Sequence, residues 1–338
     1  MLTPSGATLA TVIAAILLGG TVFAAVHHAE VVAHRIGEPF GTLVLAVAVT
    51  VIEVALIVSV MISGGAAKAA LARDTVFSAI MIVCTGIVGL CLLLGGIRHR
   101  EQDFHLQGAT SAMGVLAALS VLSLVLPNYT SSQPGPAWSQ PQLAFSGFAA
   151  LVLYGMFVFV QTIRHRDYFL PVDDTAGDET SHAKPPSKRQ TWESGVLLMA
   201  CLVAVVGLAK KLSPVIEEAV VSAGAPAALV GIVIAALVLL PEGLAAVRAA
   251  QANRLQTSLN LALGSALASI GLTIPVVAAI FIVTGQPLIL GLEAKETVLL
   301  ALTLLVSTIS LSTGRTTILQ GTVHLMIFAA FLFLSVVP

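Results

Sequence analysis

The sequence predicts an all-α integral membrane protein of about ten transmembrane helices, arranged as two inverted five-helix repeats. Hydrophobic residues make up 57% of the 338 residues and charged residues only 10%, and the mean hydropathy is +0.99. Soluble domains carry about 25% charged residues, so this chain must be covered by lipid. The net charge of −1 gives no indication of a nucleic-acid partner. Long apolar runs, and a single long polar stretch between them, supply the rest of the prediction.

The apolar runs are long enough to cross a bilayer, because a helix needs roughly 20 residues to span the hydrocarbon core. Candidate spans occupy residues 7–26, 40–62, 75–97, 107–126, 143–163, 195–212, 226–250, 257–284, 296–312 and 318–337. The first is interpreted as a true span and not as a signal peptide. It has no Lys or Arg before it and is longer than a usual signal-peptide apolar region.

Residues 164–193 form the one long polar stretch, RHRDYFLPVDDTAGDETSHAKPPSKRQTWE. The segment is rich in charge and Pro, which indicates a linker. It divides the chain into a first five-helix half, 1–163, and a second, 194–338. An odd number of helices in each half makes the second half enter the membrane in the opposite orientation. In transporters built this way, the binding site lies near the membrane midplane, between the repeats.

The basic residues of the loops predict the orientation. With both termini outside, the cytoplasmic side holds 11 basic residues: Arg35, Arg98, Arg100, Arg164, Arg166, Lys184, Lys188, Arg189, Arg248, Arg254 and Arg315. The outer side then holds 5: Lys68, Arg73, Lys210, Lys211 and Lys295. Since cytoplasmic loops carry the excess of Lys and Arg, the linker is expected in the cytoplasm and the protein in the inner membrane.

Two glutamates lie deep within predicted spans, at corresponding places in the two halves. Glu53 is the only charge between residues 40 and 62, and Glu242 follows Pro241 in the seventh span. A carboxylate near the bilayer centre costs roughly 2.5–3.5 kcal/mol on insertion scales, and no basic residue lies at comparable depth to pair with it. We therefore expect both to bind cations and protons. Pro241 removes a backbone donor and can free a carbonyl four residues earlier as a further oxygen ligand.

Hydroxyl and amide side chains near the glutamates are candidate supporting ligands, because hard cations prefer oxygen. Ser265, Ser269 and Thr273 recur every four residues and so share one helix face. The possible supporting ligands are Thr50, Ser78, Asn260, Ser265 and Ser269. The alternative is that these groups only join helices through hydrogen bonds or close packing. Asp74 is expected to cap its helix, and His324 to be a satisfied packing residue.

Four stretches resemble the ChaA-type calcium/cation–proton antiporters of the calcium:cation antiporter superfamily: residues 34–57, 73–83, 241–277 and 312–325. The resemblance implies ten helices in two inverted halves, with repeat glutamates at Glu53 and Glu242 and a small-hydroxyl motif at Gly264 and Ser265. The wider group of calcium–proton exchangers has a GNxxE-like pattern around these glutamates. This chain instead has TVIE at 50–53 and LLPE at 239–242, without the asparagine.

These features together predict a secondary antiporter that exchanges cytoplasmic calcium for protons. Burial favours the protonated form of a carboxyl, whereas a nearby cation favours the ionised form, so the pair should hold either protons or a cation. A sodium or potassium/proton antiporter that uses the same site is the alternative. An integral-membrane enzyme lacks support, since neither an HExxH-like pair nor acidic clusters at helix ends are present. A non-transporting scaffold would not need buried carboxylates. No cofactor is expected, and the oligomeric state is left open.

Overall fold

The computed structural model describes residues 4–37, 40–170, 186–222, 226, 228–285 and 288–337. Its elements are labelled α for α-helices, η for π- or 3₁₀-helical segments and β for strands. The first half contains α1 (Pro4–Ile36), α2 (Phe40–Gly64), η1 (Gly65–Lys68), α3 (Leu71–Met81), η2 (Ile82–Ile87), α4 (Val88–His99), β1 (Gln102–Asp103), α5 (Leu106–Ser120), η3 (Val121–Val125), η4 (Leu126–Tyr129), α6 (Gln140–Phe159), η5 (Val160–Arg164) and η6 (Arg166–Phe169). The second half contains α7 (Lys188–Ser222), α8 (Ala228–Gln251), α9 (Leu255–Thr284), α10 (Ala294–Leu311), β2 (Arg315–Thr316) and α11 (Ile318–Val336).

The predicted all-α membrane architecture is confirmed. Within the described ranges, nine helices are long and apolar enough to cross a membrane, and the shorter apolar helix Ala46–Ile62 lies within α2. Three segments in series, α3, η2 and α4, make one of these spans, Leu71–His99. Helices α1 and α7 extend beyond the apolar runs because polar residues at their linker-side ends, such as His34 and Arg189, continue the helix.

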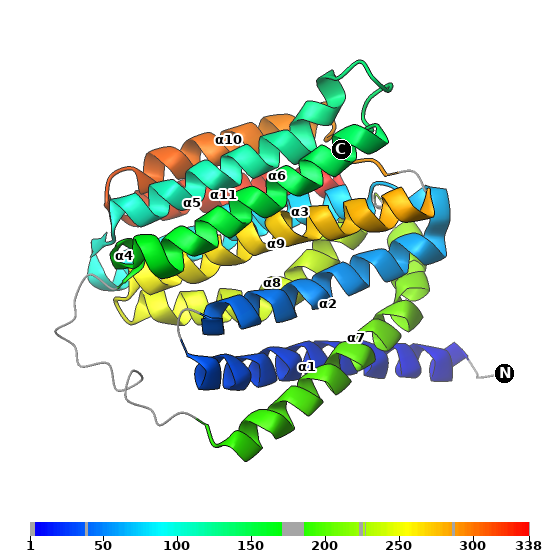
Figure 1. Cartoon of the computed structure of the whole chain (residues 1–338), viewed down its shortest axis with the longest axis horizontal. Coiled ribbons are helices and arrows are strands. Elements are labelled where there is room, and N and C mark those ends of the chain that lie inside the picture. Colours follow the sequence, from blue (N-terminus) through cyan, green and yellow to red (C-terminus); the bar gives the residue numbers. More distant parts are fainter. Residues whose placement is uncertain are drawn as a thin grey trace.

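The two halves pack crosswise through the helices that carry the repeats. Helix α2 of the first half packs on α9 of the second, and α8 packs on α3. Helix α1 starts at the end of the molecule where α11 finishes, whereas α7 starts at the opposite end, where α6 finishes (Figure 1). The two halves thus enter the bundle from opposite ends, as five helices per half require.

The third helix of each half lies at the centre of the bundle. Buried residues make up 83% of the apolar window in Leu71–His99 and 67% of that in Leu255–Thr284, against only 17% in Lys188–Leu212. Helices α1 and α7 lie side by side along one flank of the molecule (Figure 1). The central helices therefore supply the protein interior, and little of α7 is buried.

Loops at each end hold the central helices together. At the linker-side end, Gln102 Nε2 donates to the carbonyl of Ala250 at 2.9 Å, and β1 pairs antiparallel with β2. At the terminus-side end, the Ile289 N–H donates to the carbonyl of Ala69 at 3.0 Å. Contacts between the two halves thus exist at both ends of the bundle.

Candidate functional site

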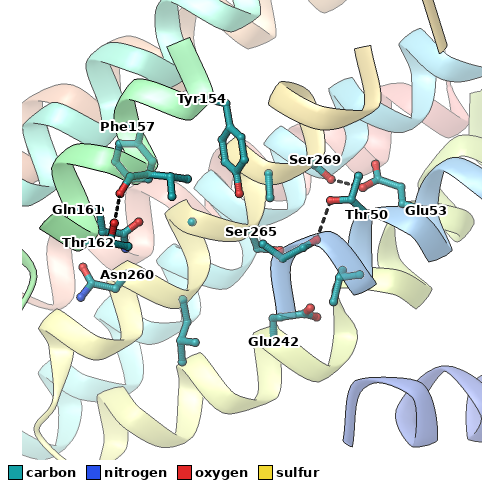
Figure 2. Close-up of a pocket in the computed structure, with 16 residues that line it drawn as sticks. Thr50, Glu53, Tyr154, Phe157, Gln161, Thr162, Glu242, Asn260, Ser265 and Ser269 are labelled. Carbon is teal, nitrogen blue, oxygen red and sulfur yellow. Dashed lines mark hydrogen bonds between the residues drawn. The ribbon is translucent and has the colours of Figure 1, made fainter. Parts of the chain in front are cut away.

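A cavity of about 110 Å³ lies between α2, α6, α8 and α9 (Figure 2). Its lining residues are Ala46, Val49, Thr50, Glu53, Tyr154, Phe157, Val158, Gln161, Thr162, Glu242, Asn260, Leu261, Gly264, Ser265, Ala268 and Ser269. Glu53, Glu242 and Ser269 lie midway along their helices, whereas Gln161 and Asn260 lie towards the linker-side ends of theirs. The cavity therefore extends from the middle of the bundle towards the linker side.

Glu53 forms the deep end of this cavity. The residue is only 2% exposed on α2, and its Oε2 accepts a hydrogen bond of 2.5 Å from Ser269 Oγ on α9. The other carboxylate oxygen, Oε1, is buried without a hydrogen-bond partner. Burial of Ile52 and Leu56 on either side of Glu53 anchors this turn of α2 in the core.

Glu242 reaches the same cavity from the second half. Its Oε2 is also buried without a hydrogen-bond partner. Pro241 lies inside α8, which nevertheless continues as one helix. On the other side, Gly243 allows η2 to approach closely: a Cβ at this position would lie 3.0 Å from Cδ1 of Ile87. Glu242 is thus flanked in the sequence by Pro241 and by Gly243, the residue at which α8 contacts η2.

The two unpartnered carboxylate oxygens are the most informative feature of the site. Leaving a buried polar group without a partner costs about 1–3 kcal/mol, and more for charged groups. A bound cation would partner these oxygens, and a proton would remove the negative charge of the carboxylate. Among the described residues, no group of three or more His, Cys, Asp or Glu side chains could hold a metal ion. A cation here would have to complete its shell with hydroxyl, carbonyl or water oxygens.

Four of the five predicted supporting ligands line the cavity: Thr50, Asn260, Ser265 and Ser269. Ser265 and Ser269 face it from α9, as their four-residue spacing predicts, and Thr50 faces it from α2. The Thr50 hydroxyl donates to the carbonyl of Ala46 at 2.8 Å, so its oxygen can still accept or coordinate. The structure therefore brings hydroxyl oxygens from both halves beside the two glutamates.

Asn260 lies at the linker-side end of the cavity and has its amide already engaged. Its Oδ1 accepts from Gln256 Nε2 at 2.9 Å, and its Nδ2 donates to the carbonyl of Phe169 at 2.6 Å. Phe169 is the last residue of η6, within the first part of the 164–193 linker. In this arrangement Asn260 ties the cavity end to the segment that follows α6.

Ser78 lies away from this cavity. Its hydroxyl donates to the carbonyl of Asp74 at 2.6 Å, and it lines a second cavity of about 330 Å³ at the terminus-side end. The lining of that cavity includes Arg73, Asp74 and Glu296. The expectation that Asp74 caps its helix is wrong, because α3 begins at Leu71 and the Asp74 carboxylate instead accepts from Arg73 Nε at 2.8 Å.

His324 is a satisfied buried residue, as expected. Its Nδ1 lies 2.6 Å from the carbonyl oxygen of Cys84, and its Nε2 lies 3.1 Å from Ser310 Oγ. The side chain is completely buried. It does not line the cavity that contains the glutamates.

Helix α6 contributes cavity residues that sequence reasoning missed. Tyr154 and Phe157 of α6, and Gln161 of η5, which continues α6, line the cavity, and the Tyr154 hydroxyl points into it (Figure 2). Their spacing of three, four and seven residues places them on one helix face, and this was the available signal. Helix α6 is the fifth span of the first half and carries neither glutamate, so a prediction built on the two buried carboxylates did not point to it.

Comparisons with known proteins agree with this architecture. The sequence matches the family described as sodium/calcium exchanger protein over residues 6–163 and 193–337. It is 52% identical over 335 residues to the protein y4hA of Sinorhizobium fredii, covering 99% of this chain and 90% of that protein. It is 39% identical over 335 residues to the sodium-potassium/proton antiporter ChaA of Escherichia coli, covering 97% of this chain and 90% of that protein.

A solved structure has the same fold. The crystal structure of the H⁺/Ca²⁺ exchanger CAX superposes with a TM-score of 0.73 at 14% sequence identity, over 96% of this chain and 82% of that one. At that identity the likeness concerns the fold alone. The matched family consists of exchangers and not of enzymes.

Proposed function

The chain belongs to the sodium/calcium exchanger protein family, and from that premise we propose that it is an inner-membrane antiporter exchanging cytoplasmic calcium for protons. The observation that carries the proposal is the pair Glu53 and Glu242. They come from opposite halves of the chain and face one cavity, and each has a buried carboxylate oxygen without a hydrogen-bond partner.

The coupling follows from charge. With both carboxyls protonated, the site is neutral and tolerates burial. With both ionised, it needs a cation, because unpaired charges in a low-dielectric interior are strongly disfavoured. Two carboxylates balance one divalent ion or two protons, so calcium is the simplest partner by charge. Mutual exclusion of cation and protons at one site then produces exchange.

Hydroxyl oxygens would complete the shell of the cation. Ser265 and Ser269 reach the cavity from α9 and Thr50 from α2, and calcium takes six to eight oxygen ligands in flexible geometry. We assign these three hydroxyls a supporting role. Asn260 would instead hold the end of the cavity, because both polar atoms of its amide are engaged.

Sodium or potassium is the second candidate cargo, for one specific reason. The E. coli relative that is 39% identical is named a sodium-potassium/proton antiporter. The cation-loaded site would then hold one cation and one proton on the two glutamates, and the proton-loaded site would hold two protons. The same residues serve both proposals, so ion competition has to separate them.

The direction of the cavity indicates the side of the membrane from which the ion site is accessible. It extends from the glutamates towards the linker side, which the basic-residue count predicts to be cytoplasmic. Helices α1 and α7 pack against each other, and at their linker-side ends Arg35 Nη1 donates to the carbonyl of Pro186 at 3.1 Å. We propose that these two helices move together past the central helices to expose the site on the other side.

Proton-gradient dissipation in everted membrane vesicles tests the function. Calcium, sodium and potassium are added in turn to vesicles containing the wild-type protein or the Glu53→Gln, Glu242→Gln double variant. We expect dissipation with calcium that the double variant lacks. Dissipation by sodium or potassium alone would favour the second candidate cargo. Equal traces for wild type, double variant and protein-free vesicles with all three ions would reject antiport.

A further inference from the structure

The third span of the first half departs from regular α-helix in its middle. The segment η2, Ile82–Ile87, is π-helical and separates α3 from α4. Its counterpart in the second half, α9, is a continuous α-helix over Leu255–Thr284. A π segment inserts an extra residue per turn, and such insertions are frequent at functional sites. In each half, the third span packs against the glutamate-bearing helix of the other half. This span contains a π segment in the first half only.

His324 of α11 lies on one side of η2. A carbonyl oxygen can only accept, so the 2.6 Å contact between Nδ1 and the Cys84 carbonyl requires the hydrogen on Nδ1. Nε2 is then free to accept from the Ser310 hydroxyl at 3.1 Å. The ring thus joins η2, α10 and α11 through two hydrogen bonds, and the carbonyl it binds lies inside the π segment.

Close packing holds the ring in this position. A Cβ at Gly89 would lie 2.9 Å from Cβ of His324, so α4 and α11 approach with almost no intervening side chain. The side chain is completely buried. The close approach of α4 and α11 at Gly89 therefore fixes the position of the His324 ring relative to η2.

The turn of α8 that carries Glu242 contacts another residue of η2. Cδ1 of Ile87 would lie 3.0 Å from a Cβ placed on Gly243, the residue after Glu242. The path from His324 to Glu242 therefore takes two contacts: the hydrogen bond to the Cys84 carbonyl and the packing of Ile87 on Gly243. No other side chain has to transmit it.

We propose that His324 is a positioning residue for the ion site: it holds η2 in its π conformation and so keeps Ile87 against the turn that aims Glu242 into the cavity. The inference rests on the proposed function of Glu242. His324 itself lines no part of the cavity and touches neither cation nor transported proton. Without the His324 donor, the Cys84 carbonyl loses its hydrogen bond to the ring, η2 can relax towards regular helix, and Ile87 turns away from Gly243.

Four variants test this inference. For each variant, the half-saturating calcium concentration and the maximal rate are measured in vesicles. Membrane yield and melting temperature are measured in parallel. His324→Leu removes the donor, and His324→Asn keeps an N–H near Nδ1. Ile87→Val removes only the methyl that meets Gly243. Thr322→Val is the matched control, because Thr322 is an exposed residue of α11.

We expect His324→Leu and Ile87→Val each to raise the half-saturating calcium concentration by roughly 10-fold and to leave the maximal rate largely unchanged. Loss of an outer-shell partner of a metal ligand typically weakens metal affinity by about 10- to 100-fold, and the lower end is expected here. His324→Asn should recover most of the affinity, and Thr322→Val should match wild type. If His324→Leu does not fold, Ile87→Val alone decides. Unchanged half-saturation in a folded Ile87→Val variant would overturn the inference, as would His324→Asn being as impaired as His324→Leu. A wild type without exchange would instead reject the proposed function.

Discussion

Ser269 Oγ donates a 2.5 Å hydrogen bond to Glu53 Oε2, so a side chain of the second half binds the repeat glutamate of the first. Each glutamate has one buried carboxylate oxygen without a hydrogen-bond partner, Oε1 of Glu53 and Oε2 of Glu242, but the serine hydroxyl donates only to Glu53. The two glutamates therefore occupy one cavity in different surroundings. We therefore expect substitutions of the residues around Glu53 and around Glu242 to have different effects.

Replacing either glutamate with glutamine should abolish exchange without preventing folding. Glutamine matches the protonated acid in size and lack of charge, but it can neither release a proton nor balance a cation. Glu53→Gln and Glu242→Gln proteins should reach wild-type membrane yield and give only the background proton flux of empty vesicles. Substantial cation-dependent flux in either variant would remove that residue from the obligatory site.

Removing the Ser269 hydroxyl should weaken cation binding more than removing the Ser265 hydroxyl. Hydrogen bonds to charged groups contribute about 1.5–3 kcal/mol, against about 1 kcal/mol for neutral ones. At 1.4 kcal/mol per factor of ten, Ser269→Ala should raise half-saturating calcium roughly 10- to 100-fold and Ser265→Ala roughly fivefold. Maximal rates should stay near wild type, because both carboxylates remain.

The two serine variants also separate a ligand role from a packing role. If the hydroxyls only join helices, yield or melting temperature should fall while half-saturation stays constant. That result for Ser265→Ala would leave Ser265 outside the binding site.

The phenolic hydroxyl of Tyr154 should contribute to affinity although it lies on a different helix from either glutamate. Its oxygen points into the cavity, whereas its ring packs on Gly271, where a Cβ would lie 2.7 Å from Cβ of Tyr154. Tyr154→Phe removes the oxygen and keeps the packing. We expect a rise of a few-fold in half-saturating calcium at unchanged melting temperature.

Tyr168→Phe is the matched control for Tyr154→Phe. Tyr168 stacks on His165 outside the cavity, so loss of its hydroxyl should leave half-saturation unchanged. An equal response of the two variants, or none in either, would argue against a role for the Tyr154 oxygen.

Cysteine labelling should reveal both the orientation and the direction in which the cavity faces. In a Cys201→Ser background, where the remaining Cys84 and Cys91 are buried, Gln161→Cys should react with an impermeant maleimide in everted vesicles. Tyr129→Cys, exposed at the terminus-side end, should react only from the opposite side, in intact cells. The reverse pattern would overturn the predicted orientation. A label near Gly177 would test the linker directly, although that residue lies outside the described ranges.

Local sequence features predicted much of this arrangement. Glu53 and Glu242 were identifiable because burying an isolated carboxylate in an apolar span costs free energy whichever way its helix faces. Ser265 and Ser269 were identifiable because helical spacing puts them on one face. Their hydrogen-bonding and cavity positions follow from that spacing together with the packing of α2 on α9.

Features set by packing between distant segments were not predictable. Ser78 faces the second cavity because α3 packs against α8 and α10 there, which no spacing within α3 reveals. The Asn260 amide is engaged by Phe169, 91 positions away in the sequence. The π segment Ile82–Ile87 contains no Pro or other residue that marks it, and its binding partner His324 lies 240 positions from Cys84.

Proton release on cation binding is the most direct test of the central claim that Glu53 and Glu242 hold protons and a cation in turn. Calcium is titrated into purified protein in weakly buffered solution while a pH dye reports released protons, with the Glu53→Gln, Glu242→Gln double variant as control. The account predicts release that saturates with calcium binding, a half-saturation that rises as pH falls because protons compete, and no release from the double variant. Calcium binding with unchanged affinity across pH and no proton release would contradict it.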